Sequence, residues 1–263
     1  MADLSLSERD TNVLEKIRDP ESNPSAGISI DPSLPSDPHI LDQSTYLQVS
    51  QREKEIVFSV QQVELQLAGL RPKSDQGPVD VYRQALSSLD DLINDRPDYA
   101  SARNNRAQVL RRLYGDSILV SEAQSLPQAL LQSVGDAERQ QAAATLLGDL
   151  DQSIALLSPR PHGSLSQQAA RTLSMAYTQR AAIYHTTAKL LASASPSVDS
   201  RRREREWKKL EFEEAASRDF AMGGRYGNDV AKGLAVSTNP TAKLCGQIVR
   251  EAMKKEYGPA FAA

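Results

Sequence analysis

Apolar residues recur three or four positions apart through most of this chain, and proline and glycine separate one such segment from the next. One stripe of this kind consists of Ile56, Val60, Val63 and Leu67. A second stripe consists of Val81, Ala85, Leu89 and Leu92. This period places apolar side chains on one face of a helix, whereas a half-buried strand has a period of two. The spacing therefore predicts a succession of amphipathic helices.

The composition agrees with a helical chain. Aromatic residues make up only 5% of the 263 residues, whereas a β-sandwich or β-barrel needs more aromatic and β-branched side chains. Alanine, leucine, glutamine and arginine, which favour helices, are abundant. A chain of this length buries a substantial core. We therefore predict an all-α protein.

Two of the predicted helices resemble each other in the order of their small and large residues. Residues 105–107 (NRA) align with residues 179–181 (QRA), at a spacing typical of the first helix of a tetratricopeptide repeat. The second helix of such a repeat has a small residue followed four positions later by a large one, as in Ala85 with Leu89 and Ala216 with Phe220. The alanine lets two helices approach closely, and the larger residue fills the space against the next repeat.

These matches predict three tetratricopeptide-type helix pairs, stacked as a short right-handed solenoid within residues 43–227. The predicted repeats span about 50–97, 98–159 with a loop insertion at 117–141, and 164–227. Three repeats are close to the minimum for a stable stack, and the end repeats need caps. An unrelated helical bundle with chance alanine periodicity is the alternative.

The two ends of the chain differ from the repeats. Residues 1–42 are rich in proline and serine, so we expect a largely disordered leader with a short helix near 8–18. Residues 228–263 are predicted to form a C-terminal helical cap, in which Asn239 caps the last helix and Pro240 starts it. Whether the leader folds back into the groove of the array stays open at this point.

Several kinds of site are not expected. The net charge is only −3, so neither nucleic acid nor a membrane surface is predicted as a partner. The three histidines (His39, His162 and His185) lie far apart in sequence, and phosphate-binding and nucleophile-elbow motifs are absent, so we predict no metal and no cofactor. One cysteine, no signal peptide and no stretch of eighteen apolar residues favour a cytoplasmic protein, which we expect to be a monomer.

Residues 198–222 are predicted to form one charged helix that contains the basic run RRREREWKK at 201–209. Glu204 and Glu206 interrupt this run, and pairs of Glu with Arg or Lys at helical spacing are typical of a solvent-exposed face. We favour this interpretation over a nucleic-acid patch, because no ladder of aromatic residues accompanies the charges. Trp207, the single tryptophan, is expected to anchor the core or a helix contact rather than to bind a partner.

Cys245 lies beside Leu244, Ile248 and Val249 on an apolar face of a predicted helix. A catalytic thiol needs a nearby base and a lowered pKa, and His185 is distant in sequence. We therefore expect Cys245 to be a small buried residue rather than a nucleophile.

Longer segments carry a more specific resemblance. They are TNVLEKIRDPESNP (11–24), ASARNNRAQVLRRLYGD (100–116), EEAASRDFAMGGRYGN (213–228) and NPTAKLCGQIVREAM (239–253). With them the chain resembles the tetratricopeptide repeat protein 36 family over nearly its whole length, as a fungal-like member with inserted loops. The C-terminal motif is the most specific part, since ordinary repeats lack it. Arg103 and Thr241 depart from the family pattern, in which tyrosines are usual.

The resemblance implies a non-enzymatic, intracellular protein that binds a segment of another protein. It also implies an association with chaperones and, from the animal members of the family, with tyrosine catabolism. We therefore predict a protein–protein interaction adaptor. The alternatives are a chaperone cofactor, a regulator associated with tyrosine catabolism as the resemblance suggests, and, in a different class, a helical enzyme whose site no motif reveals.

In a tetratricopeptide array the first helices of successive repeats line a concave groove. The alignment places seven candidate residues there, namely Ser101, Asn105, Gln108, Arg112, Met175, Gln179 and His185. Asn105 is the foremost candidate, because an amide can both donate to and accept from an extended peptide. The other role open to Asn105 is a hydrogen bond to a neighbouring helix.

A chaperone tail that ends in a carboxylate is gripped by a set of Lys, Arg and Asn side chains, because charge-assisted hydrogen bonds are strong. Here Gln179 and Met175 stand where such a set has cations, and the first repeat offers QQVELQLAG (61–69) rather than a Lys and an Asn. We therefore predict that an EEVD-type tail binds weakly or not at all.

Overall fold

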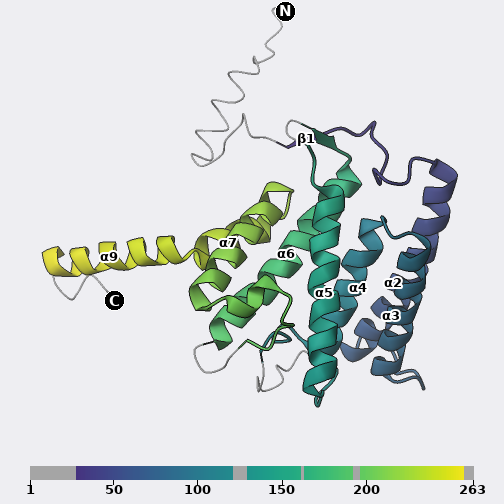
Figure 1. Cartoon of the computed structure of the whole chain (residues 1–263), viewed down its shortest axis with the longest axis horizontal. Helices are drawn as coiled ribbons and strands as arrows, with labels where there is room; N and C mark the ends of the chain where they lie inside the picture. The colour runs from purple at the N-terminus through teal and green to yellow at the C-terminus, as the bar shows by residue number, and fades with distance from the viewer. Residues whose placement is uncertain (1–27, 121–128, 161–162, 192–195, 258–263) are drawn as a thin grey trace, which may run out of the picture.

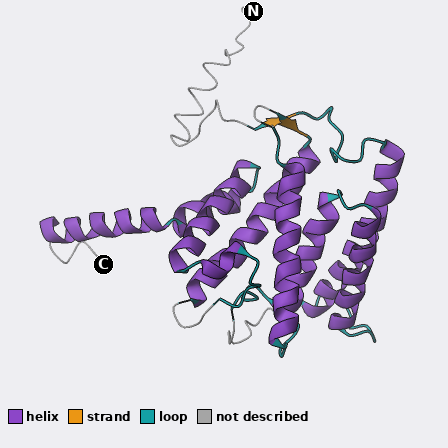
Figure 2. Cartoon of the chain, viewed as in Figure 1, coloured by secondary structure: helices purple, strands orange, loops and turns teal. Residues whose placement is uncertain are grey.

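The computed structural model describes residues 28–120, 129–160, 163–191 and 196–257, most of which are helical (Figure 2). The α-helices are α2 (Gln43–Leu67), α3 (Pro78–Asp95), α4 (Ala100–Tyr114), α5 (Asp136–Leu157), α6 (Gln167–Leu190), α7 (Lys209–Arg225), α8 (Asp229–Thr238) and α9 (Pro240–Tyr257). A 3-10 turn, η2 (Arg203–Glu206), precedes α7, and the two-residue strands β1 (Ser29–Ile30) and β2 (Ser164–Leu165) pair in parallel. The prediction of an all-α protein is confirmed. None of the described helices combines the length and apolar character needed to cross a membrane.

Each helix from α2 to α8 packs against the helix that follows it in the chain, so the helices form a row in sequence order (Figure 1). The breaks between them have local causes. Pro78 occupies the first position of α3, where its fixed φ suits a helix. Gly115 ends α4 with a φ of +81°, a conformation that favours glycine. The helices α2 with α3, α4 with α5, and α6 with α7 are therefore neighbours in space as well as in sequence.

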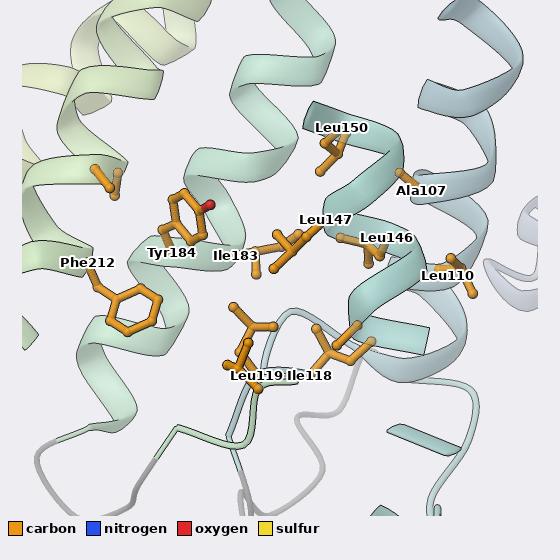
Figure 3. Packing of buried hydrophobic residues seen from close by; sticks show 14 of the residues in the cluster. Ala107, Leu110, Ile118, Leu119, Leu146, Leu147, Leu150, Ile183, Tyr184 and Phe212 are labelled. Atoms are coloured by element: carbon orange, nitrogen blue, oxygen red, sulfur yellow. The ribbon is translucent and has the colours of Figure 1, made fainter. Parts of the chain in front are cut away.

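The largest core cluster lies between α4, α5, α6 and α7. Leu147 of α5 and Ile183 of α6 are fully buried there, together with Ile118 and Leu119 from the predicted insertion at 117–141 (Figure 3). The start of that insertion is therefore part of the core. Its predicted end is also different, since α5 begins at Asp136.

Two arginines at aligned positions make the same pattern of contacts. Each one binds an aspartate on the preceding helix and another on the following helix. The first set is Asp90 of α3, Arg106 of α4 and Asp149 of α5, with both ion pairs at 2.6 Å. The second set is Asp151 of α5, Arg180 of α6 and Asp219 of α7, with both ion pairs at 2.7 Å. We call these two sets the arginine bridges.

The charged helix predicted at 198–222 is shorter than expected, because α7 begins at Lys209 and η2 precedes it. Glu204 in η2 is fully buried. Its carboxylate accepts a hydrogen bond from the Tyr184 hydroxyl at 2.6 Å and two from the Arg202 guanidinium at 2.9 Å. The prediction of a solvent-exposed face was therefore wrong at this residue. Glu204 lies in a 3-10 turn instead of the expected α-helix, and its carboxylate bonds to Tyr184 and Arg202 inside the protein.

Residues 28–42 are packed more closely than expected of a largely disordered leader. Their strand β1 pairs with β2 in the connection before α6. Ile40 is only 8% exposed, and Nε2 of His39 lies 3.0 Å from the carbonyl oxygen of Leu156 at the end of α5. These contacts fasten residues 28–42 to the helices. The helix predicted near 8–18 lies outside the described residues.

The helix α8 covers the end of the row by packing closely on α7. The helix predicted to end at residue 222 continues to Arg225, so Gly223 and Gly224 lie inside α7. A Cβ atom on Gly224 would come within 2.7 Å of the Cα atom of Lys232 on α8. The two helices can therefore approach this closely only because glycine has no side chain.

The helix α9 projects from the body instead of completing the predicted cap at 228–263 (Figure 1). Leu244 and Ile248 are 58% and 56% exposed, and Cys245 is exposed as well. The prediction of a buried cysteine was therefore wrong, because the apolar face of α9 faces solvent. Asn239 accepts hydrogen bonds from the second and third amides of α9, which confirms its predicted capping role.

Candidate functional site

A cavity of about 640 Å³ lies between α2 and α4, a size within the range of roughly 300–1,000 Å³ that is usual for ligand sites. We call it the groove cavity. Its walls come from α2, α3, α4 and the turn after α4. They consist of Ile56, Val57, Val60, Gln61, Glu64, Tyr82, Leu89, Asn105, Gln108, Val109, Arg111, Arg112, Gly115 and Asp116.

The groove cavity combines apolar and amide surfaces. Val57 and Val60 belong to the α2 wall, and Val57 is 41% exposed. Gln61 of α2 and Gln108 of α4 add amide groups, each of which can donate and accept hydrogen bonds. Such a surface can bury an apolar side chain and satisfy a nearby backbone at the same time.

The two arginines of the groove cavity are both paired with carboxylates. Nε of Arg112 lies 2.8 Å from Glu64, and Arg111 makes two hydrogen bonds to Asp116, at 2.7 and 2.8 Å. Glu64 also accepts a hydrogen bond from the Tyr82 hydroxyl at 2.6 Å. Partial burial acts to raise the pKa of Glu64, but the bonds from Arg112 and Tyr82 hold it below its ordinary value. The charges of the cavity are therefore largely balanced from within.

Glu53 of α2 forms a buried polar centre beside the groove cavity. It is 7% exposed and accepts hydrogen bonds from the Tyr99 hydroxyl at 2.5 Å and from Nδ2 of Asn105 at 2.7 Å. Ser101 also hydrogen-bonds to it. Burial raises the pKa of Glu53 in spite of these donors. Asn105 therefore has the second of the two roles that the sequence left open, a hydrogen bond to a neighbouring helix, and it also lines the cavity.

A comparison with known proteins identifies one relative. The L-tyrosine degradation gene cluster protein hmgX of Aspergillus fumigatus is 38% identical to this chain over 257 residues, which cover 96% of this chain and 93% of the relative. The chain belongs to the hmgX family. No family model matches it, and no solved structure matches it. The site of this hmgX-family chain therefore has to be interpreted from its own residues.

Four of the seven predicted groove residues come together in this hmgX-family chain. Asn105, Gln108 and Arg112 line the groove cavity, and Ser101 bonds to Glu53 at its side. All four belong to α4, whose single helical face presents them together. The alignment of α4 with a first repeat helix therefore located one wall of the cavity.

The three residues predicted on α6 do not line the groove cavity. Gln179 is buried and donates a hydrogen bond of 2.8 Å to the side-chain oxygen of Asn104, because α6 packs directly against α4. Met175 is 37% exposed on α6. His185 lies edge-on to the ring of Phe220 on α7, with the ring centres 6.3 Å apart, and burial lowers its pKa. Gln179 and His185 therefore belong to contacts of α6 with α4 and α7, and Met175 is partly exposed elsewhere on α6.

Sequence reasoning missed the carboxylates of α2. Glu53 lies three residues before Ile56, and Glu64 lies four residues after Val60. Both therefore stand at helical spacing from the apolar stripe, a position where a charged residue faces the protein, and this is the signal that could have found them. Among the residues that the structure describes, no group of three or more His, Cys, Asp or Glu side chains is placed to hold a metal ion.

Proposed function

We propose that the chain is a non-enzymatic interaction adaptor of the tetratricopeptide type, which binds a segment of another protein in the groove cavity. The observation that carries the proposal is the composition of this cavity. Valine side chains and amides line it, and its arginines are matched by carboxylates of the chain itself. This chemistry suits an extended, weakly charged peptide with an apolar side chain.

Two features support the tetratricopeptide type. Helices α2 to α8 stack in chain order, with contacts mainly between nearest neighbours, as in a helical repeat array. The two arginine bridges repeat one contact pattern from one helix pair to the next. The resemblance to the tetratricopeptide repeat protein 36 family agrees with both features and is part of the same proposal.

We further propose that this binding serves L-tyrosine degradation. The support is the name of the hmgX relative, together with its 38% identity over nearly the full length of both chains. The tyrosine catabolism implied by the sequence resemblance points to the same process. The partner would then be a protein of that process.

The chaperone-cofactor alternative has less support in the charges of the groove cavity. A tail carboxylate needs cations that are available, whereas Arg111 and Arg112 each bind a carboxylate and Glu53 adds an acidic group beside Asn105. We expect an EEVD-type peptide to bind weakly or not at all in an isothermal titration. Micromolar affinity that is lost in Asn105→Ala would overturn this expectation.

A helical enzyme is the alternative of a different class. A pocket that gathers His185, Cys245 and a carboxylate would favour it. His185 packs against Phe220 of α7, whereas Cys245 is exposed on the projecting helix α9. Among the described residues, no hydrogen bond joins the His185 imidazole to the Cys245 thiol, although Lys243 of the same helix α9 lies close enough to influence His185.

The adaptor proposal is tested by blocking the groove cavity. In Val57→Arg a long cation would fill the cavity at a partly exposed position, so the core stays intact. Ser59→Arg is the matched control, because Ser59 is an exposed residue of α2 that does not line the cavity. Affinity purification with mass spectrometry should recover the same partner with wild type and Ser59→Arg, and lose it with Val57→Arg. A partner retained by Val57→Arg would contradict the proposed site.

The role in tyrosine degradation is tested in cells. A strain without this gene should grow poorly when L-tyrosine is the sole carbon source, and wild type and Ser59→Arg should restore growth while Val57→Arg does not. Normal growth of the deletion strain would contradict the role in tyrosine degradation. Restoration by Val57→Arg would contradict only the role of the groove cavity.

A further inference from the structure

A second cavity, of about 330 Å³, lies between α6 and α7 beside η2, and it shares no lining residue with the groove cavity. We call it the tryptophan cavity, because Trp207 forms part of its wall together with Tyr177, Tyr184, Arg203 and Arg218. We propose that the tryptophan cavity binds a small aromatic carboxylic acid that carries no ammonium group.

The aromatic walls of the tryptophan cavity are held in place by further rings. Trp207 makes edge-on contacts with Tyr184 and with Phe212, with ring centres 5.3 and 5.2 Å apart. Tyr177 stacks on Tyr226 with the rings nearly parallel, at 6.1 Å. Rings fixed in this way can receive a flat aromatic ligand by offset or edge-on stacking.

Two arginines at the tryptophan cavity can hold a carboxylate. The Arg203 guanidinium lies over the Trp207 ring, 5.4 Å from its centre, and its side chain is 62% exposed. Its contact with Glu204 is long, at 3.5 Å. Arg218 is exposed on α7 and forms no ion pair within the described part of the chain. Guanidinium groups bind carboxylates by strong, charge-assisted hydrogen bonds.

The carboxylates around the tryptophan cavity are already occupied. Both oxygens of Asp219 accept hydrogen bonds from Arg180, at 2.7 and 2.8 Å. Glu204 is bonded by Arg202 and Tyr184. Asp219 is also only 5% exposed and its charge is matched by Arg180, so a ligand ammonium group would gain little from it, whereas Arg203 and Arg218 would repel that group. This favours an aromatic acid over the corresponding amino acid.

The size of the tryptophan cavity points to a ligand with one ring. Its volume is near the lower end of the range for ligand sites, roughly 300 Å³, and so suits one ring with a short acid chain better than a peptide segment. Acids of this class arise when an aromatic amino acid loses its amino group. That link rests on the proposed role in tyrosine degradation, whereas the ligand class rests on the cavity alone.

The fluorescence of Trp207, the one tryptophan of the chain, reports directly on this cavity. We expect phenylacetate, added to the full-length protein, to change this fluorescence in a saturable way. Phenylacetamide lacks the negative charge, and L-phenylalanine adds an ammonium group. Both should bind at least about tenfold more weakly than phenylacetate. Phenylacetamide loses the charge-assisted contact with the arginines, and the ammonium group of L-phenylalanine is repelled by them.

Variants of the two arginines separate binding from folding. Arg203→Gln and Arg218→Gln should each weaken phenylacetate binding about tenfold in isothermal titration, a measurement that does not depend on Trp207. Arg205→Gln is the matched control, because Arg205 is an exposed arginine of the same segment that does not line the cavity. It should bind like wild type, and all three variants should melt like wild type because their side chains are exposed.

Four results would each overturn the proposal. They are a fluorescence that phenylacetate does not change, equal binding of phenylacetamide, tighter binding of L-phenylalanine, and an equal loss in Arg205→Gln. None of these results affects the adaptor proposal, which is tested separately by Val57→Arg in the groove cavity.

Discussion

At the scale of single residues, Glu204 anchors the segment before α7 through a buried carboxylate. In the sequence it resembles Glu206, since both interrupt the basic run at 201–209. In the structure Glu206 is exposed, whereas Glu204 is buried between Arg202 and Tyr184. A buried carboxylate with three donors is satisfied, but its removal leaves the buried Tyr184 hydroxyl without its acceptor and Arg202 with Asp151 as its remaining partner.

Replacement of Glu204 by alanine should therefore destabilise the protein strongly. We expect Glu204→Ala to lower the free energy of unfolding by about 3 kcal/mol, because Arg202 and Tyr184 lose a buried partner. Glu206→Ala, the exposed control in the same turn, should change it by less than about 0.5 kcal/mol. Urea unfolding curves measure both values. Equal losses in the two variants would show that the burial of Glu204 does not matter.

Glu204 should also make stability depend on pH. Burial acts to raise its pKa, but the bonds from Arg202 and Tyr184 lower it from 4.5 to about 2. A carboxylate whose pKa is lowered by folding stabilises the folded state at pH values above its pKa in the unfolded chain. This stabilisation is lost as the pH falls toward the pKa in the folded state. The difference in unfolding free energy between wild type and Glu204→Gln should therefore shrink below about pH 4.5. Urea curves across this range test it, and a difference that grows would contradict the pairing.

At the scale of elements, the contact of α7 with α8 depends on the absence of a side chain. The predicted helix stops at residue 222, directly before Gly223 and Gly224, yet both glycines lie inside α7. Their role is to admit α8, whose Lys232 backbone would meet a Cβ on Gly224. The opposite case is α9, which has an apolar face but no covering helix among the described elements.

A methyl group at this contact should separate the two helices. Gly224→Ala is expected to lower the free energy of unfolding by roughly 1–3 kcal/mol, because the backbone of α8 has to move. Gly233→Ala is the control within α8, where a Cβ would meet nothing within 4 Å. It should stabilise the helix by about 0.5–1 kcal/mol. Urea unfolding decides, and a stabilising Gly224→Ala would refute the close approach.

At the scale of the whole molecule, the arginine bridges connect successive helices across the row. Arg106 ties α3 to α5, and Arg180 ties α5 to α7. Because contacts lie mainly between nearest neighbours, a local fault should spread only a short way along the row.

The loss of one bridge should therefore act regionally. Arg180→Ala is expected to cost about 3–5 kcal/mol, since it leaves the buried Asp219 without its partner. Amide hydrogen exchange should accelerate most in α5, α6 and α7, and least in α2. Arg171→Ala, at an exposed position of α6, serves as control and should leave exchange unchanged. Equal acceleration in all helices would argue against the array.

Part of the candidate site could be predicted, because it depends on one helix. Asn105, Gln108 and Arg112 follow one another at helical spacing on α4, so the alignment alone placed them on one surface. Gln179 was predicted on the same grounds, yet α6 packs on α4 and buries it. Periodicity shows which side chains share a face, but it does not show whether another helix covers that face.

The sequence by itself determined the all-α class, most of the helices and several of their ends, because these depend on residues a few positions apart. Pro78, Gly115 and Asn239 act in this way. The tertiary structure alone decided that Glu204 is buried, that Cys245 is exposed and that Trp207 lines a cavity. These outcomes depend on which distant segments meet, since burial and pairing are set by contacts between residues far apart in the chain.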